Sequence, residues 1–218
     1  MYKRQALKLF DKNVQILVFS DDPKWCQEQG LFADDSIMIS EGNDADIDLF
    51  GYYQSPKYFE HIKDEIKNDF KFSNEVEEIC NEMYESISGK KVVSLHIRRT
   101  DYTVNNNHPL QPMSYYEEAL KLFDKNVQIL VFSDDPAWCL KQELFSDDSI
   151  MISEGNDADV DLCLMTKCDY HIIANSSFSW WGAWLGDSEK IVAPKNWFAD
   201  SCASKSVKDM EFGNWSWL

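Results

Sequence analysis

The sequence has no long hydrophobic run and carries little positive charge. Its longest apolar stretches, such as Ile16 to Phe19 and Ile129 to Phe132, are strand-sized and far short of the roughly 20 residues that a membrane-spanning helix needs. No apolar segment follows Lys3 and Arg4, so no signal peptide is predicted. The net charge of −17 argues against nucleic-acid binding, because a phosphate backbone attracts a basic surface. We therefore expect a cytoplasmic protein without an integral membrane segment.

The six cysteines form no Cys-x-x-Cys pair, and none has a histidine at metal-ligand spacing. We therefore expect reduced, mostly packed thiols, and neither a zinc site nor a catalytic cysteine. The sequence does have an apolar fraction of 44% and an aromatic fraction of 14% over 218 residues. Such a chain can bury a sizeable core in one large domain or two small ones.

A long internal repeat dominates the organisation of the chain. Residues 6–49 recur at 119–162, and only six of the paired positions differ. Repeats of solenoid proteins diverge far more and have periods of roughly 20–50 residues, so this pair indicates a recent copying event. The second copy has the better local context, because Ser114 and Glu117 form a capping-box pattern that is expected to start a helix.

The origin of the first copy has two interpretations. Residues 1–5 resemble one translated frame of a sequencing adapter, and our hypothesis is that residues 6–49 were joined to them by an assembly or library error. A genuine tandem duplication is the alternative.

Helix and strand signals alternate along the rest of the chain. Helices are expected at 59–70, 73–87, 114–124, 157–168 and 177–186, with a helix start near Pro136 capped by Ser133, Asp134 or Asp135; strands are expected at 91–97, 127–132, 149–152, 170–174 and 190–193. This alternation predicts an α/β fold whose parallel sheet is covered on both faces. Ligands of such open sheets bind beyond the carboxyl ends of the strands.

The first motif with distinctive chemistry is HIRRTDY, at His96 to Tyr102, which follows a predicted strand. Arg98 and Arg99 present fixed forks of donors suited to phosphate, and their charge does not titrate away. A departing diphosphate needs such charge while the bond to its sugar breaks. The alternative is a solvated arginine pair beside a strand-end histidine.

The second motif is IIANSSFSWWGAWL, at Ile172 to Leu185, where a strand runs through Asn175, Ser176 and Ser177 into a helix. Free backbone N–H groups and the helix dipole favour an anion at such a helix start. The alternative is an ordinary N-cap before a packed helix. Trp180 and Trp184 are four residues apart and are interpreted as core side chains.

The third motif is FSDDPAWC, at Phe132 to Cys139. Asp134 is suited to accept hydrogen bonds from guanine or ribose, with helix capping as the alternative. Asp157-Ala158-Asp159 has the spelling of a metal-binding Asp-x-Asp motif, but we interpret it as the acidic first turn of a helix.

Taken in order, HIRRTDY, FSDDPAWC, DLCLMTKCDYHIIANSSFSWWGAWL and KIVAPKNWF resemble the bacterial family 11 glycosyltransferases, which are α-1,2-fucosyltransferases. The stretch GYYQSPKYF, at residues 51–59, resembles the segment that leads into their donor domain. The resemblance implies a GT-B-like fold with two Rossmann-type domains, of which the second binds GDP-fucose. It also implies metal-independent, inverting transfer of fucose to the 2-hydroxyl of a galactoside.

The donor-binding residues expected from the motifs and the resemblance are His96, Arg98, Arg99, Asp134, Asn175, Ser176, Ser177 and Phe178. The catalytic candidates are Arg98 and Arg99, which suit the departing GDP, and Asp101, which is either the base on the acceptor hydroxyl or a group that orients the arginines. The expected partners are GDP-fucose and a galactoside-terminated glycan, with no cofactor or metal. The resemblance is also compatible with peripheral attachment to a membrane.

The chain departs from the family at its beginning, where members have a glycine-rich stretch and a full N-terminal domain. We predict three parts: residues 1–49 as adapter remnant plus duplicated copy, 50–88 as a remnant of the acceptor domain or linker helices, and 89–218 as the GDP-sugar-binding donor domain. The copy is expected to compete with 119–162 for its position in the sheet. A non-catalytic nucleotide- or sugar-binding module and a non-functional chimeric product remain open alternatives.

Overall fold

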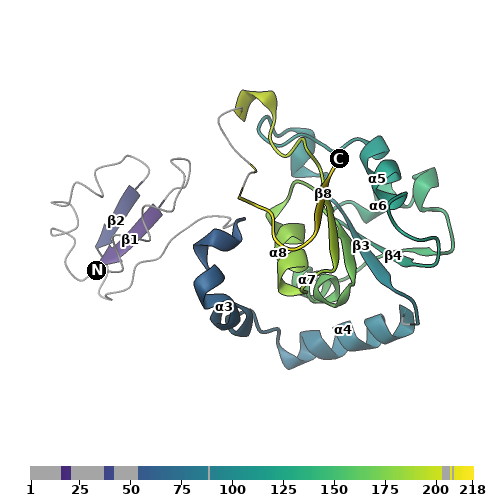
Figure 1. Ribbon diagram of the computed structural model, residues 1–218, viewed down its shortest axis with the longest axis horizontal. Coiled ribbons are helices and arrows are strands. Elements are labelled where there is room, and N and C mark those ends of the chain that lie inside the picture. The colour runs from purple at the N-terminus through teal and green to yellow at the C-terminus, as the bar shows by residue number, and fades with distance from the viewer. Residues whose placement is uncertain (1–15, 21–36, 42–53, 88, 203–206, 208) are drawn as a thin grey trace. The chain divides into compact units, whose positions relative to one another are not determined.

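The computed structural model divides the chain into two compact units, Met1–Tyr53 and Gln54–Leu218. Residues 16–20, 37–41, 54–87, 89–202, 207 and 209–218 are described (Figure 1). The predicted adapter remnant, residues 1–5, lies outside them.

The first unit contains two parallel strands, β1 (Ile16–Ser20) and β2 (Ile37–Glu41), with Ile16 opposite Ile37. The corresponding residues of the second copy, Ile129 and Ile150, face each other in the same way in the larger unit. Both copies of the repeat therefore form the same parallel strand pair in the same register.

The larger unit is built on a six-stranded sheet in the order β5-β4-β3-β6-β7-β8, in which all neighbouring strands are parallel. The strands are β3 (Val92–Ile97), β4 (Gln128–Ser133), β5 (Ile150–Ile152), β6 (Tyr170–Ile172), β7 (Lys190–Ala193) and β8 (Trp215–Trp217). The predicted α/β class with a Rossmann-type parallel sheet is confirmed. Strand β8 was not predicted, because Trp-Ser-Trp lacks the continuous apolar run that marked the equally short β5.

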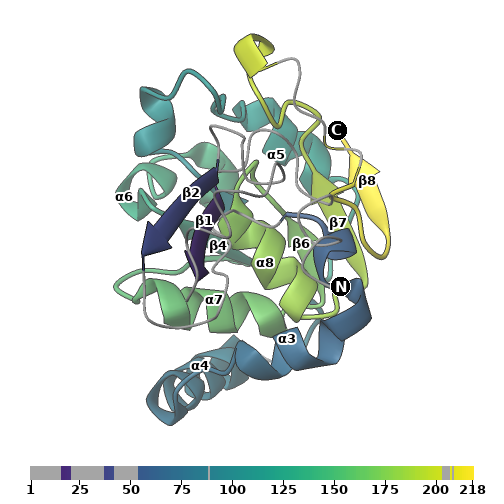
Figure 2. The same ribbon diagram turned by 90° about the vertical axis from the view of Figure 1, so that its left-hand side faces the viewer.

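Helices cover both faces of this sheet. They are α3 (Lys63–Asp69), α4 (Asn74–Ile87), α5 (Met113–Leu120), α6 (Pro136–Cys139), α7 (Ala158–Lys167) and α8 (Ser177–Leu185). Helices α5 and α6 pack on one face, and α4, α7 and α8 lie on the other (Figures 1 and 2). This two-sided cover explains why β3 is buried at every residue.

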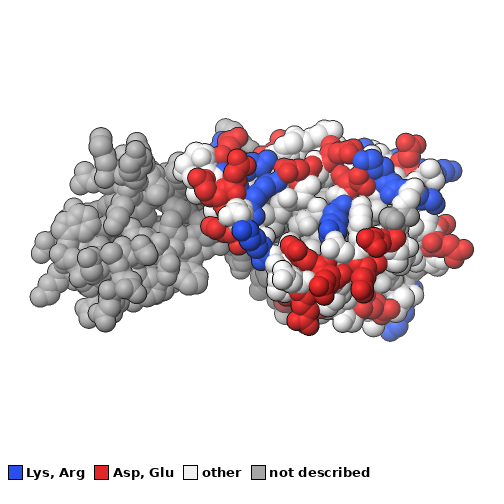
Figure 3. Space-filling view, turned by 90° about the horizontal axis from the view of Figure 1, so that it is seen from below, with Lys and Arg blue, Asp and Glu red and all other residues white. Residues whose placement is uncertain are grey.

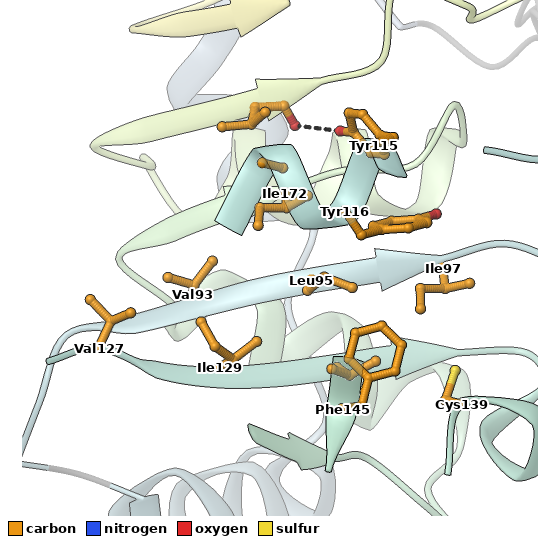
Figure 4. Packing of buried hydrophobic residues seen from close by; sticks show 13 residues of the cluster. Val93, Leu95, Ile97, Tyr115, Tyr116, Val127, Ile129, Cys139, Phe145 and Ile172 are labelled. Carbon is orange, nitrogen blue, oxygen red and sulfur yellow. Dashed lines mark hydrogen bonds between the residues drawn. The ribbon is translucent and has the colours of Figure 1, made fainter. Parts of the chain in front are cut away.

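The core beneath α5 is formed by alternate residues of the central strands. Val93, Leu95 and Ile97 of β3 belong to the same buried cluster as Tyr115 and Tyr116 of α5 (Figure 4). The Tyr115 hydroxyl donates hydrogen bonds to the carbonyl oxygens of residues 173 and 192, at 2.7 and 3.1 Å. The helix is thus fixed to the sheet by packing and by a satisfied buried polar group.

The opposite face of the sheet combines apolar packing with buried polar groups. Ser94, His96 and His171 are almost completely buried there, between the sheet and its helices. Burial lowers the pKa of His171 to about 3, although the Cys168 backbone and Asp169 act in the opposite direction. Neither ring nitrogen of His171 makes a well-aligned hydrogen bond with the described residues. The core therefore holds neutral imidazole.

An aromatic stack joins the start of the larger unit to α8. The Trp181 ring is stacked between Phe59 and Phe70, with centroids 5.2 and 4.9 Å away. Lys63 and Lys67 both pair with Asp187, just beyond the end of α8. Residues 54–87 therefore belong to the same compact unit as residues 89–218.

Two local predictions about helix starts can be compared directly with the structure. The capping box at Ser114 is wrong: α5 begins at Met113 after an extended Pro112, so Ser114 lies inside the first turn, and no side chain caps the helix. The cap of α6 is confirmed as Asp135, whose carboxylate accepts the Trp138 N–H, with Pro136 in the first turn.

The packing predictions also stand. Trp180 and Trp184 are confirmed as core residues, with 0% and 4% of their surface exposed. The five described cysteines are free thiols, and four of them, Cys80, Cys139, Cys163 and Cys168, are buried. Cys26 lies outside the described residues.

The outer face of α4 is strongly acidic. Its exposed carboxylates are Glu75, Glu77, Glu78, Glu82 and Glu85. Figure 3 shows Asp and Glu side chains gathered on this underside of the molecule. In the described part of the chain, no helix has the length and apolar character that crossing a bilayer requires.

Candidate active site

The three sequence motifs meet at one edge of the sheet. Strands β4, β3 and β6 lie side by side and end at Ser133, Ile97 and Ile172. Each motif begins on one of these strands and continues beyond its carboxyl end. The three motifs therefore lie at the edge of the sheet where open parallel sheets bind their ligands.

Arg98 leaves the end of β3 and is surrounded by acidic and aromatic groups. Its Nε lies 2.8 Å from Asp101 Oδ1 and 3.5 Å from Asp134 Oδ2, and its guanidinium lies 5.8 Å from the centre of the Tyr102 ring. Burial lowers the pKa of Arg98, but the hydrogen bond that Arg98 donates to Asp101 and the charges of both carboxylates outweigh burial and raise the pKa overall. Arg98 therefore stays charged while 34% of its side chain remains exposed.

Arg99 points toward α6 instead. Its guanidinium lies 4.2 Å from the centre of the Trp138 ring, and its Nε lies 3.2 Å from Asp135 Oδ2. A cation held over an indole face and paired with a carboxylate is well anchored. The two arginines therefore differ in their contacts. Arg99 packs on the Trp138 ring and pairs with Asp135, whereas Arg98 is held mainly by the carboxylates of Asp101 and Asp134.

Asp134 fixes the loop that carries both arginines. Its two carboxylate oxygens accept hydrogen bonds from the Arg99 N–H at 2.8 Å, the Thr100 N–H at 3.0 Å and the Thr100 hydroxyl. Its side chain is only 17% exposed. Asp134, which follows β4, thus fixes the backbone of the loop that follows β3. A contact between Asp134 and a bound donor would compete with these hydrogen bonds.

His96 faces the interior, beneath the start of α8. Its Nδ1 lies 2.9 Å from the Ser179 hydroxyl, and the centre of its ring lies 5.6 Å from the centre of the Phe178 ring. Only 3% of the residue is exposed. Burial lowers its pKa to about 3, with Arg98 acting in the same direction and Asp134 against it. His96 is therefore a neutral group that links the arginine strand to α8.

Asn175 joins two loops at the same edge. Its side-chain nitrogen donates to the carbonyl oxygens of Pro109 and Trp197, both at 3.0 Å, and its own carbonyl accepts the Tyr102 hydroxyl at 2.9 Å. Only 1% of Asn175 is exposed. The side chain expected to bind the donor is thus occupied in holding the loops that border the arginines.

Ser176 and Ser177 open α8 at this edge. Ser176 is the N-cap, and its hydroxyl accepts the Phe178 N–H at 3.3 Å, as the capping interpretation predicted. Ser177 is the first helical residue and is half-buried. The N-terminal end of the helix dipole is therefore directed toward the edge that carries the arginines.

The charges at this edge nearly cancel without a ligand. Arg98 and Arg99 face Asp101, Asp134 and Asp135, and each close pair is made through an arginine Nε. Carboxylates on Nε leave the two terminal nitrogens of a guanidinium for a second anion. The arrangement can therefore bind a phosphate group in the bidentate manner of arginine.

The acidic residues opening α7 behave as the helix interpretation predicts. Asp157 is the N-cap residue and Asp159 lies in the first turn. Within the described residues, no group of three or more His, Cys, Asp or Glu is placed to hold a metal ion.

Sequence reasoning missed the residues that hold the arginines. Trp138 and Thr100 were not singled out, and Asp135 was considered only as a cap. The available signal was the pair of consecutive acidic residues after β4. Asp135 caps α6, whereas Asp134 accepts hydrogen bonds from the loop that follows β3.

Comparison with known proteins gives a consistent assignment. The model of "Glycosyl transferase family 11" matches residues 31–218. An α-1,2-colitosyltransferase of Escherichia coli is 36% identical over 79% of this chain and 66% of its own length. The O-antigen biosynthesis glycosyltransferase WbnK of the same species is 36% identical, over 74% and 58%. A galactoside α-(1,2)-fucosyltransferase 2 of Sus scrofa is 28% identical, over 73% and 52%.

Two of these matches cover little more than half of the relative, and the first covers about two-thirds of it. Among solved structures, NodZ α-1,6-fucosyltransferase soaked with GDP-fucose aligns with a TM-score of 0.44 at 16% identity, over 64% of this chain and 62% of that one. POFUT1 in complex with GDP aligns with a TM-score of 0.46 at 13% identity, over 89% and 57%.

Proposed function

Because this chain belongs to glycosyl transferase family 11, we propose that its larger unit binds GDP-fucose at the carboxyl ends of β4, β3 and β6. The reaction we assign to the whole protein is inverting transfer of fucose to the 2-hydroxyl of a galactoside. The observation that supports this most is Arg98, whose Nε is held by Asp101 while 34% of its side chain stays exposed.

In this proposal the arginines stabilise the leaving group. Negative charge develops on the GDP diphosphate as the bond to the sugar breaks, and fixed guanidinium groups oppose that charge without reorganising. Arg98 contacts the diphosphate, and Arg99, anchored on Trp138, supplies the second guanidinium. Because these charges are permanent, donor binding is proposed to need no metal ion.

Asp101 is assigned the orienting role rather than that of the base. Its carboxylate lies 2.8 Å from Arg98 Nε, in an i,i+3 pair at the start of the loop. Because this carboxylate already accepts a hydrogen bond from the guanidinium, it would have to give up that contact to reach an acceptor hydroxyl. The base that deprotonates the acceptor hydroxyl is therefore proposed to lie elsewhere in the whole protein.

Calorimetric titration with GDP, with and without EDTA, tests the proposal. We expect binding that the chelator leaves unchanged and that Arg98→Ala weakens. The exposed ion pair of Lys121 with Glu118 is also of i,i+3 type, so Lys121→Ala is a matched control. Loss of GDP binding in EDTA would refute metal independence, and equal effects of the two variants would refute the role of Arg98.

The identity of the sugar has a second candidate. One relative at 36% identity is named an α-1,2-colitosyltransferase, so colitose is an alternative to fucose. Competition between the guanosine diphosphate derivatives of the two sugars, measured against bound GDP, distinguishes them. Tighter binding of the fucose derivative supports the proposal, and tighter binding of the colitose derivative replaces it.

A further inference from the structure

A cavity lies within the larger unit, at the edge of the sheet opposite the three motifs. Ser188, in the loop before β7, and Gly213, in the loop before β8, form part of its wall. Residues from the segment 56–63 and from the end of α8 line the rest. Strands begin at this edge, whereas the motifs lie where parallel strands end, and the nine residues of α8 span about 13 Å between the two edges. The cavity is therefore separate from the arginines.

The cavity has the size and the aromatic lining of a ligand site. Its volume is about 640 Å³, within the range of roughly 300–1,000 Å³ that is usual for such sites. Trp184 and Phe212 both line it. Trp180 and Trp215 meet the Phe212 ring nearly at right angles, with ring centres 5.2 and 5.5 Å away. These contacts fix the Phe212 ring, which is only half-buried and can therefore pack against a ligand.

Charged side chains of both signs line the same cavity. Lys57 pairs with Asp209, and Lys63 Nζ lies 3.0 Å from Asp187 Oδ1. Between 45% and 67% of each of these four side chains is exposed, so a ligand can reach them. Burial raises the pKa of Asp187, but hydrogen bonds from Lys67 and Lys63 outweigh burial and lower the pKa overall. Asp187 is therefore an ionised hydrogen-bond acceptor at neutral pH.

The mixture of charges indicates the class of ligand. With Glu60 and Glu211, four carboxylates and two lysines line the cavity. The carboxylates oppose an anion and the lysines oppose a cation, so neither charge suits the site. The hydroxyls of a neutral sugar donate hydrogen bonds to carboxylates and accept them from ammonium groups, and its C–H face packs against an aromatic ring. We propose that this cavity binds a neutral oligosaccharide, away from the edge assigned to GDP-fucose.

Titration of the full chain with lacto-N-neotetraose, a neutral tetrasaccharide, tests the proposal by ligand-observed NMR. Asp209→Ala should weaken binding about tenfold, because it removes a charged hydrogen-bond acceptor. Glu118→Ala is the matched control, since Glu118 is likewise an exposed acid paired with a lysine, and it should bind as the parent does. Phe212→Leu keeps an apolar side chain without the ring and should also weaken binding. Thermal unfolding verifies that each variant is folded.

The remaining outcomes contradict the proposal in different ways. A parent chain that does not bind the tetrasaccharide, or equal affinities of Asp209→Ala and Glu118→Ala, would show that the cavity is not a saccharide site. Loss of saccharide binding in Arg98→Ala would place the sugar at the arginine edge instead. Binding of inorganic phosphate that Lys57→Ala abolishes would identify an anion site. Because the titration contains no GDP, its result is independent of the proposed donor binding.

Discussion

At the scale of single residues, two adjacent arginines have different surroundings. Arg99 lies over Trp138 and pairs with Asp135, whereas Arg98 pairs with Asp101 and keeps more of its surface exposed. We predict that Arg98→Ala weakens GDP binding about tenfold to a hundredfold, which is the value of a charge-assisted hydrogen bond. Its unfolding temperature should stay near that of the parent.

Arg99→Ala should also weaken GDP binding, and unlike Arg98→Ala it should destabilise the fold. Loss of the contact with Trp138 should lower the free energy of unfolding by roughly 1 kcal/mol. Calorimetry and thermal unfolding of both variants separate the two effects. A larger loss of stability in Arg98→Ala than in Arg99→Ala would contradict this division.

The buried histidines predict acid sensitivity. Burial lowers the pKa of His96 and His171 to about 3, below the unfolded value of about 6.5. Their contribution to stability is therefore complete above pH 6.5 or so and is lost as the pH falls from there toward 3, at roughly 1 kcal/mol per pH unit for each histidine.

Urea unfolding at a series of pH values measures this slope. His171→Phe should reduce it, because the variant removes one of the two buried histidines that take up a proton on unfolding. Exposed His61 provides the control, so the slope of His171→Phe is compared with that of His61→Gln. A slope that is the same in His171→Phe and the parent would show that His171 does not contribute.

At the scale of loops and strands, Asp134 connects β4 to the loop after β3 through three hydrogen bonds. If Asp134 acts by positioning the arginines, Asp134→Asn should lower the affinity for GDP and for inorganic pyrophosphate by the same factor. If it contacts guanine or ribose, only GDP binding should weaken. We predict the first result, and calorimetry with both ligands decides between them.

The limits of sequence-based prediction also appear at this scale. Strands β3 and β4 were found because both are long and apolar, and Asp135 was among the expected caps because Pro136 follows it. The start of α5 was misplaced because Ser114 and Glu117 have capping-box spacing, whereas the extended Pro112 starts the helix earlier. Partners distant in sequence, such as Asn175 with Pro109, leave no periodic signal.

At the scale of the whole molecule, the chain spans about two-thirds or less of the relatives described above. Positioning of the acceptor hydroxyl can supply about 7–11 kcal/mol of the barrier to transfer, and in a two-domain enzyme the other domain contributes to it. We therefore predict that this chain binds GDP-fucose but transfers fucose poorly.

An assay of GDP release with lactose or N-acetyllactosamine measures transfer, and release without acceptor is the background. Acceptor-dependent turnover near the typical enzyme rate of about 10 per second would overturn this prediction. It would show that the units present here suffice to position an acceptor.

The stacking of Trp181 between Phe59 and Phe70 determines where this protein can be cut for engineering. A fragment that begins at residue 89 would lack both phenylalanines and the two lysines that pair with Asp187. The Trp181 indole would then be exposed to solvent, and such an apolar surface promotes aggregation. A fragment that begins at Gln54 keeps them all. When this unit is exchanged between members of the family, the junction should therefore lie before Ser55. A junction there keeps Phe59, Phe70 and Trp181 in the same fragment.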